Sequence, residues 1–157
     1  SRDKNHSFSS MVAAWNDTGI GQIMVERVDS EAIENYGVAD LGTQASEPFK
    51  SVPIKGLVEK PSPAEAPSNL AVLGRYILPP GVLGLLETTV AGVGDEIQLT
   101  DALDELLKIE GLNAFETDAD VFDCGNKRGF LSANLAVGMR DPETKLTIKA
   151  LIEKNAW

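Results

Sequence analysis

The sequence predicts a domain of the α/β class, in which short strands alternate with amphipathic helices. Apolar residues form short extended runs over 22–28 and 70–78, which is typical of strands. They recur at helical spacing over 98–111 and 127–139, which is typical of helices that pack on a core. Glycine and proline separate these runs. With 157 residues, the chain is long enough for one domain with a substantial core.

The first 60 residues predict one helix followed by three extended segments. A helix that ends at Gly19 is expected to have an apolar face made of Phe8, Met11, Val12 and Trp15. Strands are expected over 22–28 and 36–42, and a longer extended stretch over 49–60. Ile23 and Val25 share one side of the first strand, because side chains alternate along a strand. Pro53 cannot donate to a ladder, so it predicts a bend or a sheet edge.

The rest of the chain predicts a loop, further strands and four helices. In order, these are a proline-rich loop (61–69), a strand (70–78), a short helix after Pro80, a helix (98–111), one or two strands that end at Asp123, and helices over 127–139 and 141–157. Thr100 is expected to cap the helix 98–111 and Gly111 to end it. The short helix is expected to bury Val82, Leu83, Leu85 and Leu86.

Composition and charge exclude several classes of function. The formal net charge is −10, so the surface repels nucleic acids and anionic lipids, and an anionic substrate needs a local basic group. The lone Cys124 forms no intrachain disulfide, which favours a reducing compartment, and we expect the cytoplasm. With one histidine, a His-rich metal site is excluded, whereas an all-oxygen magnesium site is not. No apolar run is long enough to span a membrane.

Glu59 and Lys60 form an adjacent acid and base where the segment "KGLVEKP" leaves a predicted strand. Ligands of open α/β sheets bind at the carboxyl ends of strands. Lys60 is suited to neutralise a phosphate group and Glu59 to accept hydrogen bonds from sugar hydroxyls. The pattern by itself favours a solvated charge pair at the entrance to a loop.

Three further positions have both a chemical and a structural interpretation. Asp123, in "VFDCGN", is placed to bind magnesium or to cap the helix that follows. Gly37 follows Tyr36, so it either forms a simple turn or lets a sugar approach the backbone. Gly74 lies inside the strand 70–78, where a glycine marks a bulge or a close approach. Taken singly, each position fits the structural interpretation.

Taken in order, the motifs resemble one enzyme family. "EKPSPAEAPSNLAVLGRYIL", "DEIQLTDA" and "VFDCGN" together resemble the carboxyl-terminal half of bacterial UTP–glucose-1-phosphate uridylyltransferases. The similarity runs from about Thr18 to Asp141, which is most of the chain. It implies a partial Rossmann-like mixed sheet of the sugar nucleotidyltransferase type, followed by carboxyl-terminal helices. The sugar-binding half of that domain is expected over 1–140 and a final helix over 141–157.

The resemblance implies a reaction and a set of residue roles. The family joins UTP and glucose 1-phosphate into UDP-glucose and pyrophosphate, with Mg²⁺. Glu59 resembles the acid that binds the glucose hydroxyls, and Lys60 resembles the catalytic lysine whose positive charge holds the sugar phosphate. Gly37 and, more loosely, Gly74 resemble positions that line the sugar pocket. Asp123 resembles one of two aspartates that bind the metal.

Parts of the family's site have no counterpart in these 157 residues. The glycine-rich loop that binds the nucleotide and the second metal-binding aspartate are both missing from the sequence. We therefore expect a truncated enzyme, inactive alone and prone to form homo-oligomers through the sheet edge that this exposes. One alternative is a non-catalytic module that binds sugar phosphates or oligomerises through 127–157. The other is a related thymidylyltransferase.

Overall fold

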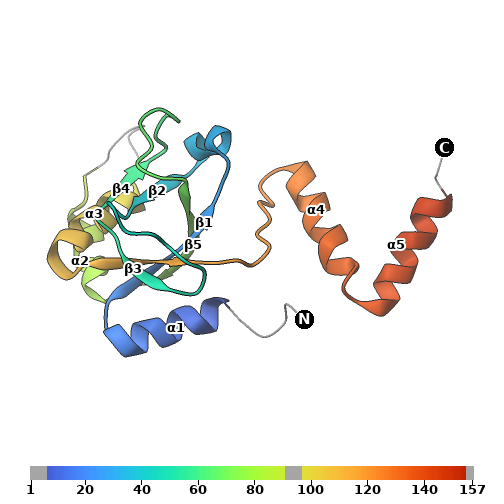
Figure 1. Ribbon diagram of the computed structural model, residues 1–157, viewed down its shortest axis with the longest axis horizontal. Helices are drawn as coiled ribbons and strands as arrows, with labels where there is room; N and C mark the ends of the chain where they lie inside the picture. The colour runs from blue at the N-terminus through green and yellow to red at the C-terminus, as the bar shows by residue number, and fades with distance from the viewer. Residues whose placement is uncertain (1–6, 91–96, 155–157) are drawn as a thin grey trace. The chain divides into compact units, whose positions relative to one another are not determined.

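The computed structural model describes residues 7–90 and 97–154 (Figure 1). The chain forms two compact units, the first ending at Asp118 and the second beginning at Ala119. This division comes earlier than the boundary at residue 140 that the sequence indicated, and the functional division at 140 stays a prediction. The α/β class is confirmed, because a mixed sheet and helices make up the first unit.

The first unit is built on a six-stranded sheet with the order β3-β6-β1-β5-β2-β4. Its strands are β1 (Gly21–Arg27), β2 (Gly37–Asp40), β3 (Ser51–Pro53), β4 (Gly56–Glu59), β5 (Leu70–Ile77) and β6 (Leu112–Glu116). β1 and β6 are parallel, and the other described pairs are antiparallel. The predicted stretch 49–60 therefore supplies both edges of the sheet. Pro53 lies in the edge strand β3, which confirms the expectation for that residue.

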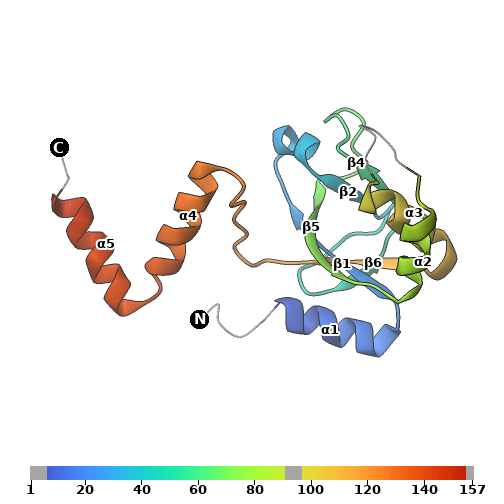
Figure 2. The same ribbon diagram turned by 180° about the vertical axis from the view of Figure 1, so that it is seen from behind.

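Helices cover both faces of this sheet (Figures 1 and 2). They are α1 (Ser7–Thr18), the 3₁₀ turn η1 (Ser30–Asn35), α2 (Gly81–Thr88) and α3 (Leu99–Glu110). Ile23 and Val25 belong to the core that contains α2 and α3, whereas Met24 packs with Met11 of α1. The alternation predicted for the first strand is thus confirmed, and its side chains pack into two separate cores on opposite faces of the sheet.

A buried polar network ties the edge strand β3 to its neighbours. Gln22 is fully buried and accepts a hydrogen bond of 2.8 Å from the Ser51 hydroxyl. Asn113 Nδ2 donates to the same hydroxyl at 2.9 Å. Because buried polar groups without partners are costly, this network specifies how β1, β3 and β6 align.

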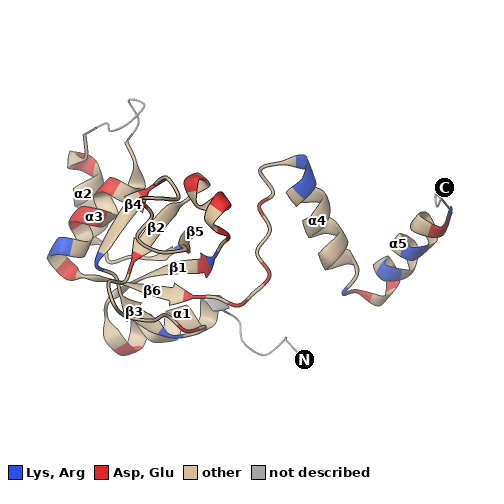
Figure 3. Ribbon diagram, turned by 45° about the horizontal axis from the view of Figure 1, so that its top comes forward, with Lys and Arg blue, Asp and Glu red and all other residues tan. Residues whose placement is uncertain are grey.

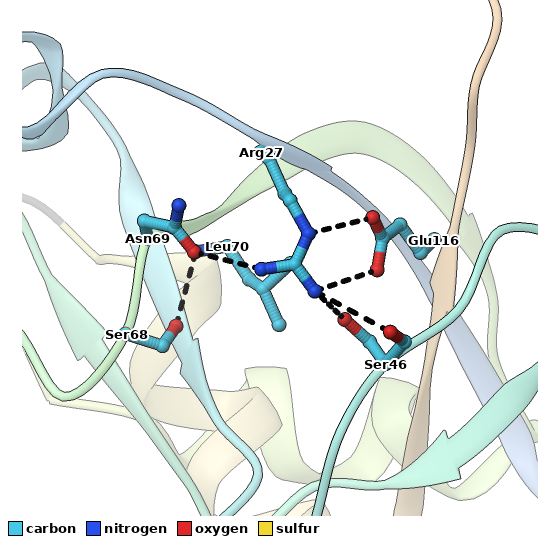
Figure 4. Close-up of polar contacts among 6 residues, drawn as sticks. All are labelled: Arg27, Ser46, Ser68, Asn69, Leu70 and Glu116. Carbon is cyan, nitrogen blue, oxygen red and sulfur yellow. Dashed lines mark hydrogen bonds and ion pairs between the residues drawn. The ribbon is translucent and has the colours of Figure 1, made fainter.

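Arg27 ends β1 and joins four segments of the first unit (Figure 4). Its Nε donates to Glu116 Oε1 at 3.0 Å, its Nη1 to Asn69 Oδ1 at 3.1 Å and its Nη2 to Ser46 Oγ at 2.7 Å. The Glu116 side chain is only 6% exposed. The guanidinium therefore neutralises a buried carboxylate and anchors the far end of the loop 61–69.

Three local expectations were wrong. Helix α3 begins at Leu99 with Gln98 at its N-cap, so Thr100 lies inside the helix and cannot cap it. Leu83 is 64% exposed, because α2 turns it away from the sheet. The strand expected to reach Asp123 stops at Glu116. Acidic residues crowd the segment that follows, and these are poor strand formers.

The second unit contains two helices, α4 (Lys127–Gly138) and α5 (Pro142–Lys154). Asp141 caps α5, because its carboxylate accepts hydrogen bonds from the N–H groups of Thr144 and Glu143. Hydrogen bonds from the N–H and hydroxyl of Thr144 hold the pKa of Asp141 below its ordinary value. The described residues of α4 and α5 include none that is buried. No helix in the described ranges combines the length and apolar character needed to cross a membrane.

Candidate functional site

Two of the predicted site residues, Gly37 and Glu59, meet in a cleft of the first unit. They are direct partners in the antiparallel β2–β4 ladder. The cleft has a volume of about 210 Å³ and lies between these strands, β5 and the start of α3. Its polar lining comes mainly from Asn35, Glu59, Tyr76, Gln98 and Thr100. A small concave site with a few polar groups suits a small polar ligand.

The carboxylate of Glu59 is held by its neighbours in this cleft. The Thr100 hydroxyl donates a hydrogen bond of 2.7 Å to Glu59 Oε2. A Cβ atom on Gly37 would lie 3.1 Å from the same oxygen, which is closer than an ordinary contact. Burial raises the pKa of Tyr76, and the negative charge of Glu59 raises it further. The glycine therefore leaves room for the carboxylate, and Thr100 supplies a contact that the sequence did not reveal.

A second, wider cleft of about 530 Å³ shares Glu59 and Thr100 with the first. It is lined by the end of α2 and by the acidic side chains of Asp101, Asp104 and Glu105 on α3. Lys108 bridges the last two acids, with a nitrogen–oxygen distance of 2.8 Å to each. The α3 side of this wider cleft is therefore acidic, and it disfavours binding of an anionic group there.

Lys60 follows β4 in an unusual backbone conformation. Its φ is 45°, in the left-handed region, and its N–H donates to the Tyr36 carbonyl at 3.0 Å. Such a conformation costs roughly 1–3 kcal/mol for a non-glycine residue and is often found at functional sites. The side chain is exposed, and among the described residues it is not part of the lining of either cleft.

Gly74 lies in a β-bulge rather than in the cleft. The register between β1 and β5 shifts between Ile23 and Val25, opposite the stretch of β5 that contains Gly74. The glycine is exposed, and no described heavy atom lies within 4 Å of the position of a Cβ. The bulge interpretation is therefore confirmed, while a role for Gly74 in sugar binding stays a prediction.

Asp123 belongs to the second unit, where it organises the turn before α4. Its Oδ1 accepts from the Gly125 N–H at 2.8 Å, and its Oδ2 accepts from Asn126 Nδ2 at 3.0 Å. Asn126 caps α4 by accepting from the Gly129 N–H at 2.8 Å. A Cβ atom on Gly129 would overlap the main-chain carbonyl of Asp123. The cap alternative thus belongs to Asn126, and Asp123 is oriented through it.

The donor set around Asp123 suits magnesium as part of a larger ligand set. The side chain is exposed, and each carboxylate oxygen still has a lone pair beyond the hydrogen bond that it accepts. Within the described ranges, no group of three or more His, Cys, Asp or Glu residues is arranged to hold a metal. One carboxylate together with substrate phosphates and water is an arrangement that Mg²⁺ commonly adopts.

Comparison with known proteins now identifies the family. The nucleotidyl transferase family matches residues 3–139 of the chain. The chain belongs to the nucleotidyl transferase family. A curated relative, the UTP–glucose-1-phosphate uridylyltransferase of Haemophilus influenzae, is 43% identical over 98% of this chain and 52% of its own length. The chain therefore spans about half the length of the curated relatives that it matches.

Solved structures show the same similarity. The UTP-bound UGPase from Acinetobacter baumannii is 38% identical, with a TM-score of 0.85, and the match covers 95% of this chain and 50% of that one. A UDP-glucose pyrophosphorylase complexed with UDP-glucose is 34% identical, with a TM-score of 0.80, over 90% of this chain and 52% of that one. The resemblance and the fold type expected from the sequence are both confirmed for this nucleotidyl transferase chain.

Proposed function

We propose that this chain supplies the sugar-phosphate-binding part of a protein that makes UDP-glucose and pyrophosphate from UTP and glucose 1-phosphate. The relatives named for this activity support the proposal, as does a similar protein complexed with UDP-glucose. The observation that carries it is the cleft in which Glu59, Gly37 and Thr100 converge. A fixed carboxylate beside a bare backbone is suited to accept hydrogen bonds from sugar hydroxyls.

The proposed reaction brings two anions together. A phosphate oxygen of glucose 1-phosphate attacks the α-phosphorus of UTP, and the bond from that phosphorus to pyrophosphate breaks. The first unit carries 19 acidic and 8 basic side chains, and Figure 3 shows Asp and Glu spread over its helices and loops. Against this field, the ammonium of Lys60 would neutralise and aim the sugar phosphate. Glu59 would orient the hexose and Gly37 would border it, while Gly74, outside this cleft, would shape β5, the strand that lines the pocket.

Asp123 would contribute one carboxylate to a magnesium ion. When bound, Mg²⁺ would draw charge from the α-phosphate and the leaving pyrophosphate. Glu59 and Lys60 would meanwhile hold the sugar phosphate in line, since positioning and charge neutralisation dominate this class of transfer. The chain spans half the length of its relatives, so we expect little turnover from these 157 residues by themselves. We expect it to act in a reducing compartment, the cytoplasm.

The test is a pyrophosphate-release assay on the complete polypeptide that carries this chain. We expect Lys60→Ala to lower turnover by at least ~100-fold, the scale of losing one preorganised charge contact. Lys55→Ala is a matched control, because Lys55 is also exposed and precedes β4 by one residue. An unchanged rate for Lys60→Ala would remove Lys60 from the mechanism. Turnover with dTTP but not with UTP would support the thymidylyltransferase alternative.

The helical unit supports a second candidate function, association with another copy. Its helices carry exposed apolar side chains, among them Phe130, Leu131, Leu146 and Ile152. Exposed apolar surface of this kind is typical of protein interfaces. Sedimentation velocity of the complete polypeptide would test this, and a monomer at micromolar concentration would contradict it.

A further inference from the structure

We propose that Thr100 is a positioning residue that fixes the Glu59 carboxylate for sugar recognition. This inference deepens the proposed function and rests on it. The sequence indicated a helix cap at Thr100, yet α3 already begins at Leu99. The hydroxyl instead bonds a side chain 41 residues away, on the last residue of β4.

The choice of hydrogen-bond partner is informative. A threonine inside a helix ordinarily bonds a carbonyl of the preceding turn, as Thr88 does with Leu85 at 3.0 Å. Thr100 lies in the first turn of α3, where it has no earlier helical carbonyl to accept from it. Its hydroxyl is therefore available to Glu59. Bonds from a hydroxyl to a carboxylate are stronger than bonds between neutral groups.

The geometry leaves Glu59 with a defined capacity for a ligand. Thr100 uses one lone pair of Oε2, at 2.7 Å, and the missing Cβ of Gly37 leaves space beside the same oxygen. Oε1 and the remaining lone pair of Oε2 can then accept from two adjacent sugar hydroxyls. Glu59 is otherwise exposed, and the terminal torsion of a glutamate is broad. Without Thr100, the carboxylate would sample orientations that do not match the sugar.

The charge near Glu59 gives a second reason for a fixed donor. Asp101, Asp104 and Glu105 line the neighbouring cleft, where Lys108 offsets part of their charge, and the remaining negative charge repels the Glu59 carboxylate. The Thr100 hydroxyl and the amino end of α3 oppose this repulsion, since the helix dipole favours an anion there. Thr100 thus holds the carboxylate at the boundary of the two clefts.

The experiment measures initial rates of the complete polypeptide as a function of glucose 1-phosphate and, separately, of UTP. Thr100→Val keeps the shape of the side chain and removes the hydroxyl. We expect it to raise KM for glucose 1-phosphate by about 10-fold, the scale of one hydrogen bond to a charged group, with KM for UTP and kcat little changed. Thr100→Ser should restore the affinity. Thr147→Val is the matched control, because the Thr147 hydroxyl bonds the Glu143 carbonyl of its own helix and lines neither cleft.

A double-mutant cycle separates positioning from a structural role. If Thr100 acts through Glu59, Thr100→Val should have no further effect on KM for glucose 1-phosphate once Glu59→Ala, which removes the acceptor, is present. Additive effects, or a loss of kcat and of UTP affinity together, would overturn the proposal. A wild-type protein that forms no pyrophosphate from UTP and glucose 1-phosphate would overturn the proposed function itself, and this inference with it.

Discussion

Replacing Gly37 with alanine should separate sugar binding from stability. The new Cβ would lie 3.1 Å from Glu59 Oε2, and 3.8 Å from the nearest atom of Val72. The second distance is an ordinary contact, whereas the first requires one partner to move. The backbone of Gly37 is not in the left-handed region, so alanine fits the strand itself. The end of the Glu59 side chain is therefore the part that yields.

The size of the effect follows from these distances. To reach an ordinary contact of 3.4 Å, the carboxylate must shift by a few tenths of an ångström. That shift disturbs the 2.7 Å bond from Thr100 and, under the proposed function, would misalign the carboxylate oxygens for the sugar hydroxyls. We expect KM for glucose 1-phosphate to rise about 10-fold, which corresponds to ~1.4 kcal/mol. The free energy of unfolding should change by less than about 1 kcal/mol, because alanine loses less entropy than glycine in a strand.

Steady-state kinetics and thermal unfolding of the complete polypeptide test both parts. The control is Gly56→Ala, which makes the same change in the same β2–β4 ladder. A Cβ on Gly56 would meet Asp40 Cβ at 3.9 Å, an ordinary contact away from Glu59. Gly56→Ala should leave both KM values unchanged. Equal effects of the two substitutions, or an unfolding Gly37→Ala variant with normal sugar affinity, would refute the role assigned to this glycine.

Three further outcomes are expected from polar contacts outside the cleft. Arg27→Met strips the 6%-exposed Glu116 carboxylate of its guanidinium. It should lower the free energy of unfolding by about 2–3 kcal/mol, less than for a fully buried pair because Arg27 is half exposed. Calorimetry should show the melting temperature falling by roughly 5–10 °C, and an unchanged value would contradict this. Gly129→Ala should push the Asp123 carbonyl aside, reducing both helical circular dichroism and turnover; if neither falls, the close packing there is incidental. Because the pKa of Asp141 is lowered in the folded protein, its carboxylate stabilises α5 at pH values above the ordinary pKa of aspartate. This contribution is lost as the pH falls through the lowered pKa. Acid-induced loss of helix below about pH 4 should therefore be smaller in Asp141→Asn, and an identical pH profile would exclude that cap as the cause.

Local patterns in the sequence were enough to predict most of the elements. The alternation around Ile23 and Val25 predicted β1 and its buried face, and Gly111 ends α3 with a φ of 76°. Pro53 indicated a sheet edge because it lacks a donor. These features depend on neighbours in sequence, which a pattern records directly.

Contacts between distant segments could not be predicted in the same way. Thr100 looked like a cap because its own helix was the only partner visible in the sequence, and its bond to Glu59 exists only once α3 packs near β4. The contact between Arg27 and Glu116 could not be predicted either, because these residues are 89 positions apart and meet only in the folded sheet. The prediction of a strand that reaches Asp123 was wrong. Apolar Val121 and Phe122 resemble the end of a strand, but β6 already ends at Glu116, and acidic residues follow it.

The geometry around β2 explains why two motifs far apart in the sequence act as one structural unit. Gly37 pairs with Glu59 across the ladder, and the carbonyl of Tyr36 accepts the N–H of Lys60 at 3.0 Å. The Tyr36-Gly37 pair therefore serves as the template on which the acid and the base are aligned. A slip of one residue in this register would turn Glu59 to the other face of the sheet, away from Thr100. The left-handed φ of Lys60 then redirects the chain immediately after the ladder ends. Under the proposed function, the acid held in the strand would bind the sugar hydroxyls, and the base that follows the strand would bind the phosphate of the same molecule.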